Sequence, residues 1–235
     1  MMVVKRMYKN YEDILSVKLV SYTQPAEDYQ YLLSDENSDA LTNLIAYCAR
    51  VSNPSNQDNT ETSEKLLGYL IKNKHWSPFE MVNVCLEITS TRDIVRQILR
   101  HRSFSYQEFS QRYADPTKEL EFCIKEARGQ DSKNRQNSLD NISIVNKQTW
   151  RYIQERTIET SLNAYTWAIE NGIAKEVARV VLPEGNTVSR CYMNGTIRSW
   201  IHYLEVRDGN GTQKEHMLVA RACAEAINKI FPYIK

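Results

Sequence analysis

Residues 81–89 show the most regular alternation of apolar and polar positions in the chain. The apolar members are Val82, Val84, Leu86 and Ile88. Because successive side chains of an extended chain point to opposite faces, this period of two predicts a strand with one buried face. Three other short, apolar-rich segments predict further strands: 14–22, 120–124 and 187–193.

Apolar residues recur with a helical period in most of the remaining chain. The predicted helices are 38–50, 62–74, 91–102, 147–171, 174–182, 196–207 and 213–231. Ser38 is suited to cap the first of them, and Gly172 is a natural stop for the longest. The residues predicted to trace the inner side of that longest helix are Trp150, Ile153, Thr157, Leu162, Tyr165, Ala168 and Ile169.

Three polar segments, 23–36, 52–60 and 127–146, are predicted loops, and the last of them is interpreted as a surface insertion. A chain of 235 residues is most simply one domain over residues 1–235. Since no Gly-rich phosphate loop follows a predicted strand, a dinucleotide-binding fold has no support. The order of the elements agrees with an α+β fold.

Composition narrows the class of protein. The net charge of +1 exerts no general attraction on nucleic acid or membrane, so any basic chemistry must be local. No apolar run approaches the roughly 20 residues of a membrane span, and no signal peptide is visible at the N-terminus. The five Cys are widely spaced without a CxxC pair, which favours buried thiols in a reducing cytoplasm over disulfides or a zinc site.

The segment 92–112 concentrates positive charge, with five Arg against two acidic residues. An Arg stripe on a helix is often only a solvated face, and for the helix alone this alternative stays open. However, Arg100-His101-Arg102 is followed by a dense set of polar side chains without Gly or Pro. Because Arg offers a planar fork of donors suited to phosphate, this convergence indicates an anion site.

The same residues carry a resemblance to a known family. Arg100-His101-Arg102, seven residues and Ser110 form the motif RHR-x7-S, and its longer form includes Ser105, Arg112 and Tyr113. This pattern resembles the signature of the flavin-dependent thymidylate synthases. Other segments similar to the family's motifs are 49–52, 75–80, 176–183 and 198–213, so the resemblance covers about residues 45–216.

The resemblance implies a twisted, largely antiparallel sheet with long helices, and a homotetramer with flavin sites between subunits. It also implies FAD as cofactor, NADPH as reductant, and dUMP and 5,10-methylenetetrahydrofolate as substrates. The expected location is the cytosol of a bacterial or virus-infected cell. No membrane or nucleic-acid partner is expected.

Carried over position by position, the resemblance implies two sets of contacts. The flavin set is Ser77, Arg100, His101, Arg102, Glu108 and His202. The dUMP set is Gln97, Arg100, Glu108, Ser110, Arg112, Arg179 and Arg207, with Ser52 and Gln213 as second-rank candidates. Within these sets Arg207 is expected to polarise the pyrimidine, and His101 and Arg102 to hold the flavin through charge and phosphates. Thr196 replaces the family's usual Asn, and His202 stands where some members have Asn.

Thymidylate synthesis must polarise C6 of uracil before a carbon reaches C5. No Cys lies in a basic motif that would lower its pKa, which agrees with chemistry that needs no protein sulfur. Ser110 lacks an obvious base and is interpreted as a hydrogen-bond donor to the nucleotide phosphate. Two alternatives stay open: a nucleic-acid-binding module that stacks bases on the aromatics of 104–113, and a flavin-binding protein without synthase activity.

Overall fold

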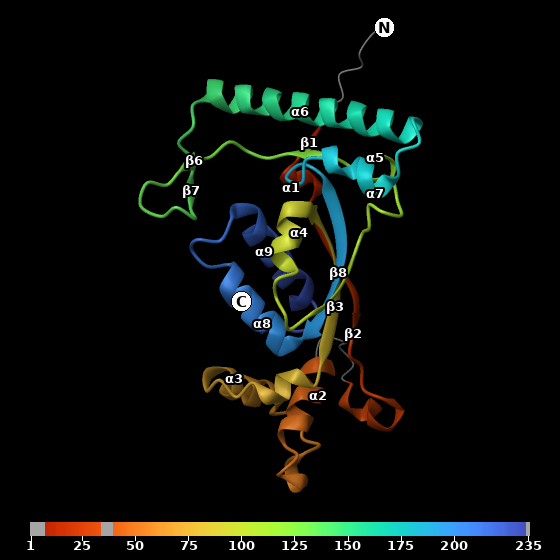
Figure 1. Cartoon of the computed structure of the whole chain (residues 1–235). Coiled ribbons are helices and arrows are strands. Elements are labelled where there is room, and N and C mark those ends of the chain that lie inside the picture. The colour runs from red at the N-terminus through yellow and green to blue at the C-terminus, as the bar shows by residue number, and fades with distance from the viewer. Residues whose placement is uncertain (1–7, 34–39, 234–235) are drawn as a thin grey trace.

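The computed structural model describes residues 8–33 and 40–233, so the predicted cap Ser38 lies outside the described residues. A twisted four-stranded sheet runs through the molecule in the order β2-β3-β8-β4, and every neighbouring pair is antiparallel (Figure 1). Its strands are β2 (Ser16–Tyr22), β3 (Asn83–Thr91), β8 (Val188–Thr196) and β4 (Ser105–Glu108). The mixed helix-and-sheet class with an antiparallel sheet is therefore confirmed.

Two small strand pairs lie outside this sheet. The parallel pair joins β1 (Lys9–Asn10) to β5 (Cys123–Ile124). The antiparallel pair joins β6 (Gly129–Gln130) to β7 (Ser138–Leu139). Because β6, β7 and the first residues of a helix fall within 127–146, the prediction that this whole segment is loop was wrong.

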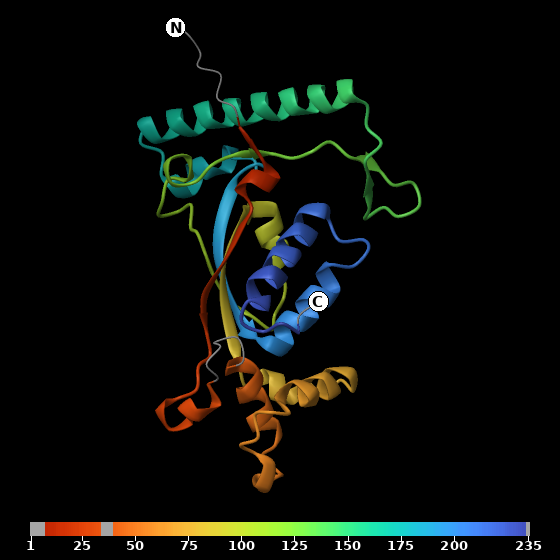
Figure 2. The same cartoon turned by 180° about the vertical axis from the view of Figure 1, so that it is seen from behind.

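The helices lie at three places around the sheet. Their bounds are α1 (Tyr11–Ile14), α2 (Ala40–Ala49), α3 (Ser63–Lys72), α4 (Arg92–Ile98), α5 (Pro116–Glu119), α6 (Ile144–Glu170), α7 (Lys175–Ala178), α8 (Ile197–Arg207) and α9 (Lys214–Asn228), with 3-10 turns η1 (Glu27–Leu32), η3 (Pro54–Asn56), η4 (Ser77–Glu80) and η5 (Arg179–Val181). Helices α4, α8 and α9 cover one face, α6 crosses one end, and α2 and α3 lie at the opposite end (Figures 1 and 2). None of the helices in the described part of the chain is both long and apolar enough to span a membrane.

The alternation in β3 was predicted correctly, since Val84, Leu86 and Ile88 are fully buried while the residues between them are not. The helix predicted over 91–102 ends at Ile98, and the one predicted over 174–182 divides into α7 and η5. The predicted strand 187–193 continues to Thr196, because β8 pairs with β3 along its whole length.

The inner side of the long helix was predicted only in part. Tyr165 and Ala168 are buried, but Trp150 and Ile153 are 44% and 46% exposed. The apolar contacts of α6 come from its second half, where Ile158 packs in a small cluster separate from the main core, while Arg151 and Gln154 in its first half make hydrogen bonds to other elements. Of the five thiols, those at positions 48 and 85 are only partly buried, so the expectation of five buried Cys was also too broad.

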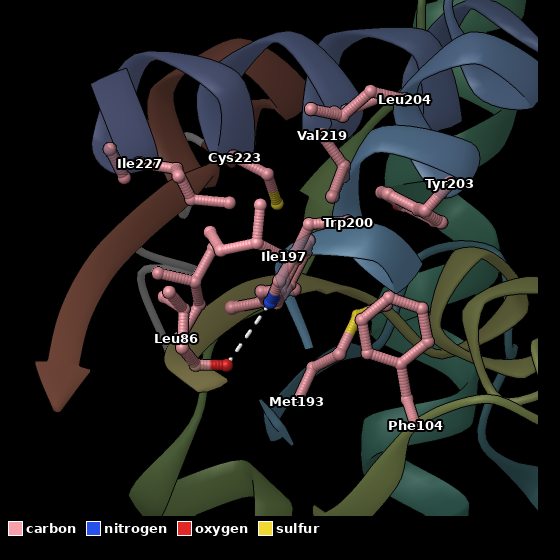
Figure 3. Packing of buried hydrophobic residues seen from close by; sticks show 14 of the residues in the cluster. Leu86, Phe104, Met193, Ile197, Trp200, Tyr203, Leu204, Val219, Cys223 and Ile227 are labelled. Atoms are coloured by element: carbon pink, nitrogen blue, oxygen red, sulfur yellow. Dashed lines mark hydrogen bonds between the residues drawn. The ribbon is translucent and has the colours of Figure 1, made fainter. Parts of the chain in front are cut away.

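The main core forms between the sheet and the helices α8 and α9. Trp200 lies at its centre, fully buried, and its indole N–H donates to the carbonyl oxygen of Val84 at 3.1 Å (Figure 3). Phe104 packs edge-on against Trp200, with ring centroids 4.8 Å apart. This contact joins the Arg-rich segment to the core, because Phe104 follows Arg102 by only two residues.

The ring of Phe104 lies directly on Gly195 of β8, where a β-carbon would overlap the ring. We therefore expect Gly195→Ala to lower the free energy of unfolding by about 1–3 kcal/mol through overpacking. Gly68 is the matched control: it lies exposed in α3 with nothing within 4 Å of an added β-carbon. Gly68→Ala should be neutral or stabilise by about 0.5–1 kcal/mol. Urea denaturation compares the two, and equal stability of both variants would contradict this account of Gly195.

Candidate active site

Residues 100–102 form a turn between α4 and β4, called here the RHR turn. Two aromatic side chains hold it in place. The hydroxyl of Tyr106 donates to the carbonyl oxygens of Ile98 and His101, each at 2.9 Å, while Phe104 enters the core. The chain therefore leaves the helix after Ile98, and the cationic side chains of the turn are not drawn inward.

Arg100 and Arg102 are both exposed, and neither guanidinium makes a hydrogen bond or ion pair with any described residue. Most other Arg side chains in the described chain have a carboxylate partner, among them Arg92, Arg96 and Arg112. Two neighbouring cations without a counter-charge create a positive potential that attracts an anionic ligand, and guanidinium groups bind phosphate oxygens in pairs.

His101 is half-buried between two residues of α8. Its Nε2 accepts a hydrogen bond of 2.8 Å from Nε of Arg207, and its ring packs edge-on against Tyr203 with centroids 4.9 Å apart. Burial and then the neighbouring cations, first Arg207, lower the pKa of His101 to about 4. His101 is therefore neutral near pH 7, with the proton on Nδ1, and its contact with flavin stays a prediction.

Four predicted site residues gather around the buried His216 of α9. We call them the Arg207 cluster: Gln97, His101, Arg207 and Gln213. The carboxamide of Gln97 bonds to Gln213 at 2.8 Å and to Nδ1 of His216 at 3.2 Å. The His101 and His216 rings lie 6.3 Å apart, and Nε of Arg207 contacts His101. Since Nε is engaged, both Nη groups of Arg207 are available to a ligand; neither bonds to a described residue.

A second group of predicted residues lies around the edge strand β4. We call it the Glu108 cluster: Glu108, Ser110, Arg112 and Arg179. Glu108 accepts from Nη1 of Arg92 at 3.4 Å and from Ser189 at 3.1 Å, both through Oε1. Arg112 pairs with the Glu176 carboxylate at 3.4 Å, and Arg179 donates to the Glu176 carbonyl oxygen. Glu176 thus brings these two Arg close together.

A cavity of about 360 Å³ opens between α4 and the α7–η5 region beside this cluster. It is lined by Arg92, Arg96, Gln111, Glu176, Arg179, Val180, Leu182 and Glu184. Gln111 is 3% exposed, and its side-chain nitrogen has no hydrogen-bond partner in the described chain. Three guanidinium groups and one unused amide donor make the cavity suitable for an anion, although two carboxylates also line it.

Ser77 and His202 flank a third location. Both side chains are exposed; His202 lines a cavity of about 290 Å³ beside α8, and Ser77 follows Trp76, another residue of the cavity wall. Its other lining residues are Trp76, Ser103, Arg198, Ser199, Ile201 and Glu205. Because Ser103 follows the RHR turn directly, this cavity lies next to the unpaired Arg102.

The residues predicted to bind dUMP together lie at two separate places within one chain. Arg207 ends α8, whereas Arg179 begins η5, which packs against α6 at the end of the sheet (Figure 1). Among the residues that the structure describes, no hydrogen bond or ion pair joins the Arg207 cluster to the Glu108 cluster. Ser52 is exposed in a separate loop, which the buried Arg50 holds through the Asn59 carbonyl and Thr62.

None of the candidate nucleophiles is activated. Oγ of Ser110 accepts from the backbone N–H of Arg112 at 3.3 Å and has no His, Lys or carboxylate partner in the described chain. Burial raises the pKa of Cys123 and Cys191 to about 12 and also raises that of the other three thiols. A thiolate or alkoxide at these positions is therefore not available near pH 7.

Thr196 fills a structural role where the family has Asn. Its hydroxyl accepts from the Ser199 N–H at 3.2 Å and caps α8, a role that Asn can also fill. Sequence reasoning missed Arg92, Gln111, Tyr203 and His216. Arg92 belongs to the Arg stripe already noticed, but nothing in the local pattern distinguishes its buried side chain from a solvated one.

The arrangement of elements is shared with a solved methylase. The structure of a UMP/dUMP methylase, PolB from Streptomyces cacaoi, bound with 5-Br dUMP matches with a TM-score of 0.75 at 24% identity, covering 93% of this chain and 91% of that one. The same protein bound with 5-Br UMP matches with a TM-score of 0.74 at 25% identity. At this identity the likeness shows the fold.

Sequence comparison then identifies the family. The family described as thymidylate synthase complementing protein matches residues 32–233. A probable flavin-dependent thymidylate synthase of Paramecium bursaria Chlorella virus 1 is 48% identical over 220 residues, or 94% of this chain and 97% of the relative. The flavin-dependent thymidylate synthase of Synechocystis sp. has the same identity and coverage. The chain belongs to the family of the flavin-dependent thymidylate synthases.

Proposed function

We propose that this chain methylates dUMP to dTMP with bound FAD, with 5,10-methylenetetrahydrofolate as one-carbon donor and NADPH as reductant. The observation that carries the proposal is the RHR turn, where two exposed guanidinium groups without counter-charge flank a neutral His101 bonded to Arg207. Guanidinium groups suited to phosphate, close to a cation suited to a pyrimidine base, support this proposal.

The residues fit a flavin dinucleotide. Arg100 and Arg102 match its pyrophosphate, and Ser77 and His202 provide hydrogen-bonding groups beside the adjoining 290 Å³ cavity. Glu108, the remaining member of the flavin set, has Oε2 free to accept from a ligand donor. When bound, reduced FAD supplies the hydride.

The substrate residues have separable roles. Arg112 and Arg179 hold the phosphate of dUMP, and Ser110 donates a hydrogen bond to it. Gln97 and Arg207 meet the edge of the pyrimidine, where the Nη groups of Arg207 stabilise negative charge that develops on the ring. No protein nucleophile is required, which agrees with the raised thiol pKa values.

The division of these residues between two clusters supports assembly with further copies of the chain, as in the homotetramer that the resemblance implies. Phosphate and base of one dUMP are joined by a single ribose, so both clusters must meet at each site, and a second copy of the chain brings them together. Helix α6 offers an exposed apolar surface for such an assembly. Its members are Ile144, Val145, Trp150, Tyr152, Ile153 and Trp167.

The nucleic-acid alternative finds no support in the aromatic residues that suggested it. Phe104 is buried in the core, and the hydroxyl of Tyr106 is engaged by the RHR turn. Tyr113, at 80% exposure, is the one strongly exposed aromatic ring of this segment. A single exposed ring does not make the row of platforms on which successive bases stack.

The purified protein is expected to be yellow with a flavin absorption spectrum, and to form dTMP from dUMP only when folate and NADPH are both present. Flavin-containing protein that binds dUMP without forming dTMP would instead support the flavin-binding alternative.

Ser110→Ala tests the proposal that Ser110 is not a nucleophile. It should weaken dUMP binding by about 1–3 kcal/mol and keep measurable turnover; a covalent nucleotide adduct on Ser110 in a mass spectrum would contradict this.

A further inference from the structure

A continuous chain of side-chain hydrogen bonds links the Arg207 cluster to Arg128, a residue of the 127–146 segment. Arg128 contacts both carboxylate oxygens of Glu215, at 2.8 and 3.0 Å. Nε2 of Gln213 donates to Oε2 of Glu215 at 2.9 Å, and Gln97 continues the chain to His216. His216 in turn bonds to the Tyr203 hydroxyl at 3.1 Å.

Glu215 is the only residue in this series of hydrogen bonds that can only accept them. It is 2% exposed; burial raises its pKa, but Arg128 and the hydrogen bond from Gln213 outweigh burial, so the net pKa is lowered. Glu215 is therefore an ionised carboxylate near pH 7, without a proton to donate. The Gln, His and Tyr groups of the chain can each donate or accept.

The ionised carboxylate of Glu215 determines which group donates and which accepts in each of the other hydrogen bonds. Because Glu215 accepts, Gln213 must turn its Nε2 towards it and its Oε1 towards Gln97. Gln97 then donates through Nε2, so its Oε1 faces Nδ1 of His216 and must accept from it. His216 is neutral, since burial and nearby Arg207 lower its pKa to about 3, and its Nε2 accepts from the hydroxyl of Tyr203.

We call this series of hydrogen bonds the relay; it runs from Arg128 through Glu215, Gln213 and Gln97 to His216 and Tyr203. We infer that the relay fixes the orientation of the Gln97 carboxamide and thereby makes the site select uracil over cytosine. The inference rests on the proposed function, in which Gln97 meets the base. After its two relay bonds, Gln97 keeps one N–H and one lone pair of Oε1. Oε1 matches the N3–H of uracil, and the N–H matches the adjacent carbonyl oxygen, while Arg207 takes the other carbonyl.

Cytosine presents the opposite pattern at the same two positions, with an acceptor at N3 and an amino donor at C4. It would need the Gln97 amide turned by 180°. While Glu215 is ionised, that rotation brings two acceptors or two donors face to face inside the relay. The two groups are then buried without a hydrogen bond, which makes binding of cytosine less favourable in free energy. Glu215, Gln213 and Arg128 are thus positioning residues: they act on the base through Gln97.

Glu215→Gln tests the relay with almost no change in shape. Gln at position 215 can donate, so every bond from Gln213 to Tyr203 can reverse and remain satisfied, and the Gln97 amide is no longer held in one orientation. The dissociation constants of dUMP and dCMP, measured on the flavin-loaded protein by calorimetry, should show the dUMP preference reduced by about tenfold or more, with dCMP binding tighter than before. A merely structural role would weaken both nucleotides equally.

Gln213→Leu is the second variant, in case Glu215→Gln does not fold. It breaks the relay between Glu215 and Gln97 at a half-buried position and should reduce the same preference. Tyr11→Phe is the matched control, because it removes a buried hydroxyl that bonds to Ser90 and to the backbone carbonyl of Glu215, outside the relay. It should keep the wild-type ratio.

The outcomes separate the relay from the function on which it rests. If the wild-type protein binds dUMP and forms dTMP but both relay variants keep its dUMP-to-dCMP ratio, the relay assignment is overturned and the proposed function is not. If both variants weaken the two nucleotides in parallel, the relay is structural only. If the wild-type protein binds no dUMP, the proposed function fails and this inference fails with it.

Discussion

Arg207→Ala is expected to lower kcat by roughly 100-fold or more, the effect of removing a preorganised group that meets charge developing in a transition state. The geometry supports this role. Nε of Arg207 is engaged by His101 at 2.8 Å, so the guanidinium plane is held in place and its two Nη groups are free to act on the base. Since that charge exists mainly in the transition state, KM should change less than kcat.

Arg112→Ala should give the opposite kinetic pattern. Arg112 is 57% exposed at its side chain, and the phosphate contact proposed for it stabilises substrate and transition state about equally. Its loss should raise KM and leave kcat less affected. Arg207→Lys should recover only part of the lost rate, because a point charge replaces the planar fork.

Steady-state kinetics with measured flavin content distinguishes these variants. The flavin content matters because Arg207→Ala also removes the hydrogen-bond partner of His101 Nε2. Rates are therefore compared per bound flavin. If both Ala variants show the same defect in KM alone, Arg207 is only another binding residue and the division of roles is wrong.

His101→Ala and Arg102→Ala are each expected to yield folded protein that has lost most of its flavin. For Arg102 the reason is charge, since its exposed guanidinium has no counter-charge among the described residues. For His101 the reason is shape and hydrogen bonding, because its neutral ring packs on Tyr203 and positions Arg207. The flavin affinities of the two variants should therefore depend differently on salt concentration. The remaining affinity of Arg102→Ala should depend much less on salt than that of the unchanged protein, whereas the remaining affinity of His101→Ala should keep this dependence.

Flavin absorbance after gel filtration measures the retained cofactor, with circular dichroism as the test of folding. Arg156→Ala is the matched control, because Arg156 is exposed on α6 and pairs only with Glu159, three residues along the same helix. It should keep its flavin. Full flavin retention by His101→Ala would remove His101 from the cofactor site.

Part of this architecture could be predicted because local chemistry decides it. The period of two in β3 is enforced by burial of one sheet face, so Val84, Leu86 and Ile88 share the inner face, and a shift of register by one residue would turn all three outward. Gly172 ends α6 with a φ of +77°, a backbone conformation that Gly adopts without steric cost. The RHR-x7-S motif likewise identifies the family, because its spacing is a local property of the chain.

Other features were decided by contacts between distant parts of the chain. Helical periodicity would carry α4 on to Arg102, but the hydroxyl of Tyr106 and burial of Phe104 on Gly195 pull the chain out of the helix after Ile98. Trp150 has the spacing of an inner residue, yet it is 44% exposed, because the inward position in that part of α6 is taken by Gln154, which bonds to Lys125 and Asn186.

The sequence by itself determined the strand pattern of β3, the helix stops and the motif residues, since each depends on neighbours within a few positions. Only the tertiary structure decided that Arg112 and Arg207 fall into different clusters, and that Gln97 is oriented by Gln213 and His216. These two partners lie 116 and 119 residues away from it along the chain. A hydrogen bond has a direction only once its partner is in place, and no local pattern of residues encodes which distant side chain that partner will be.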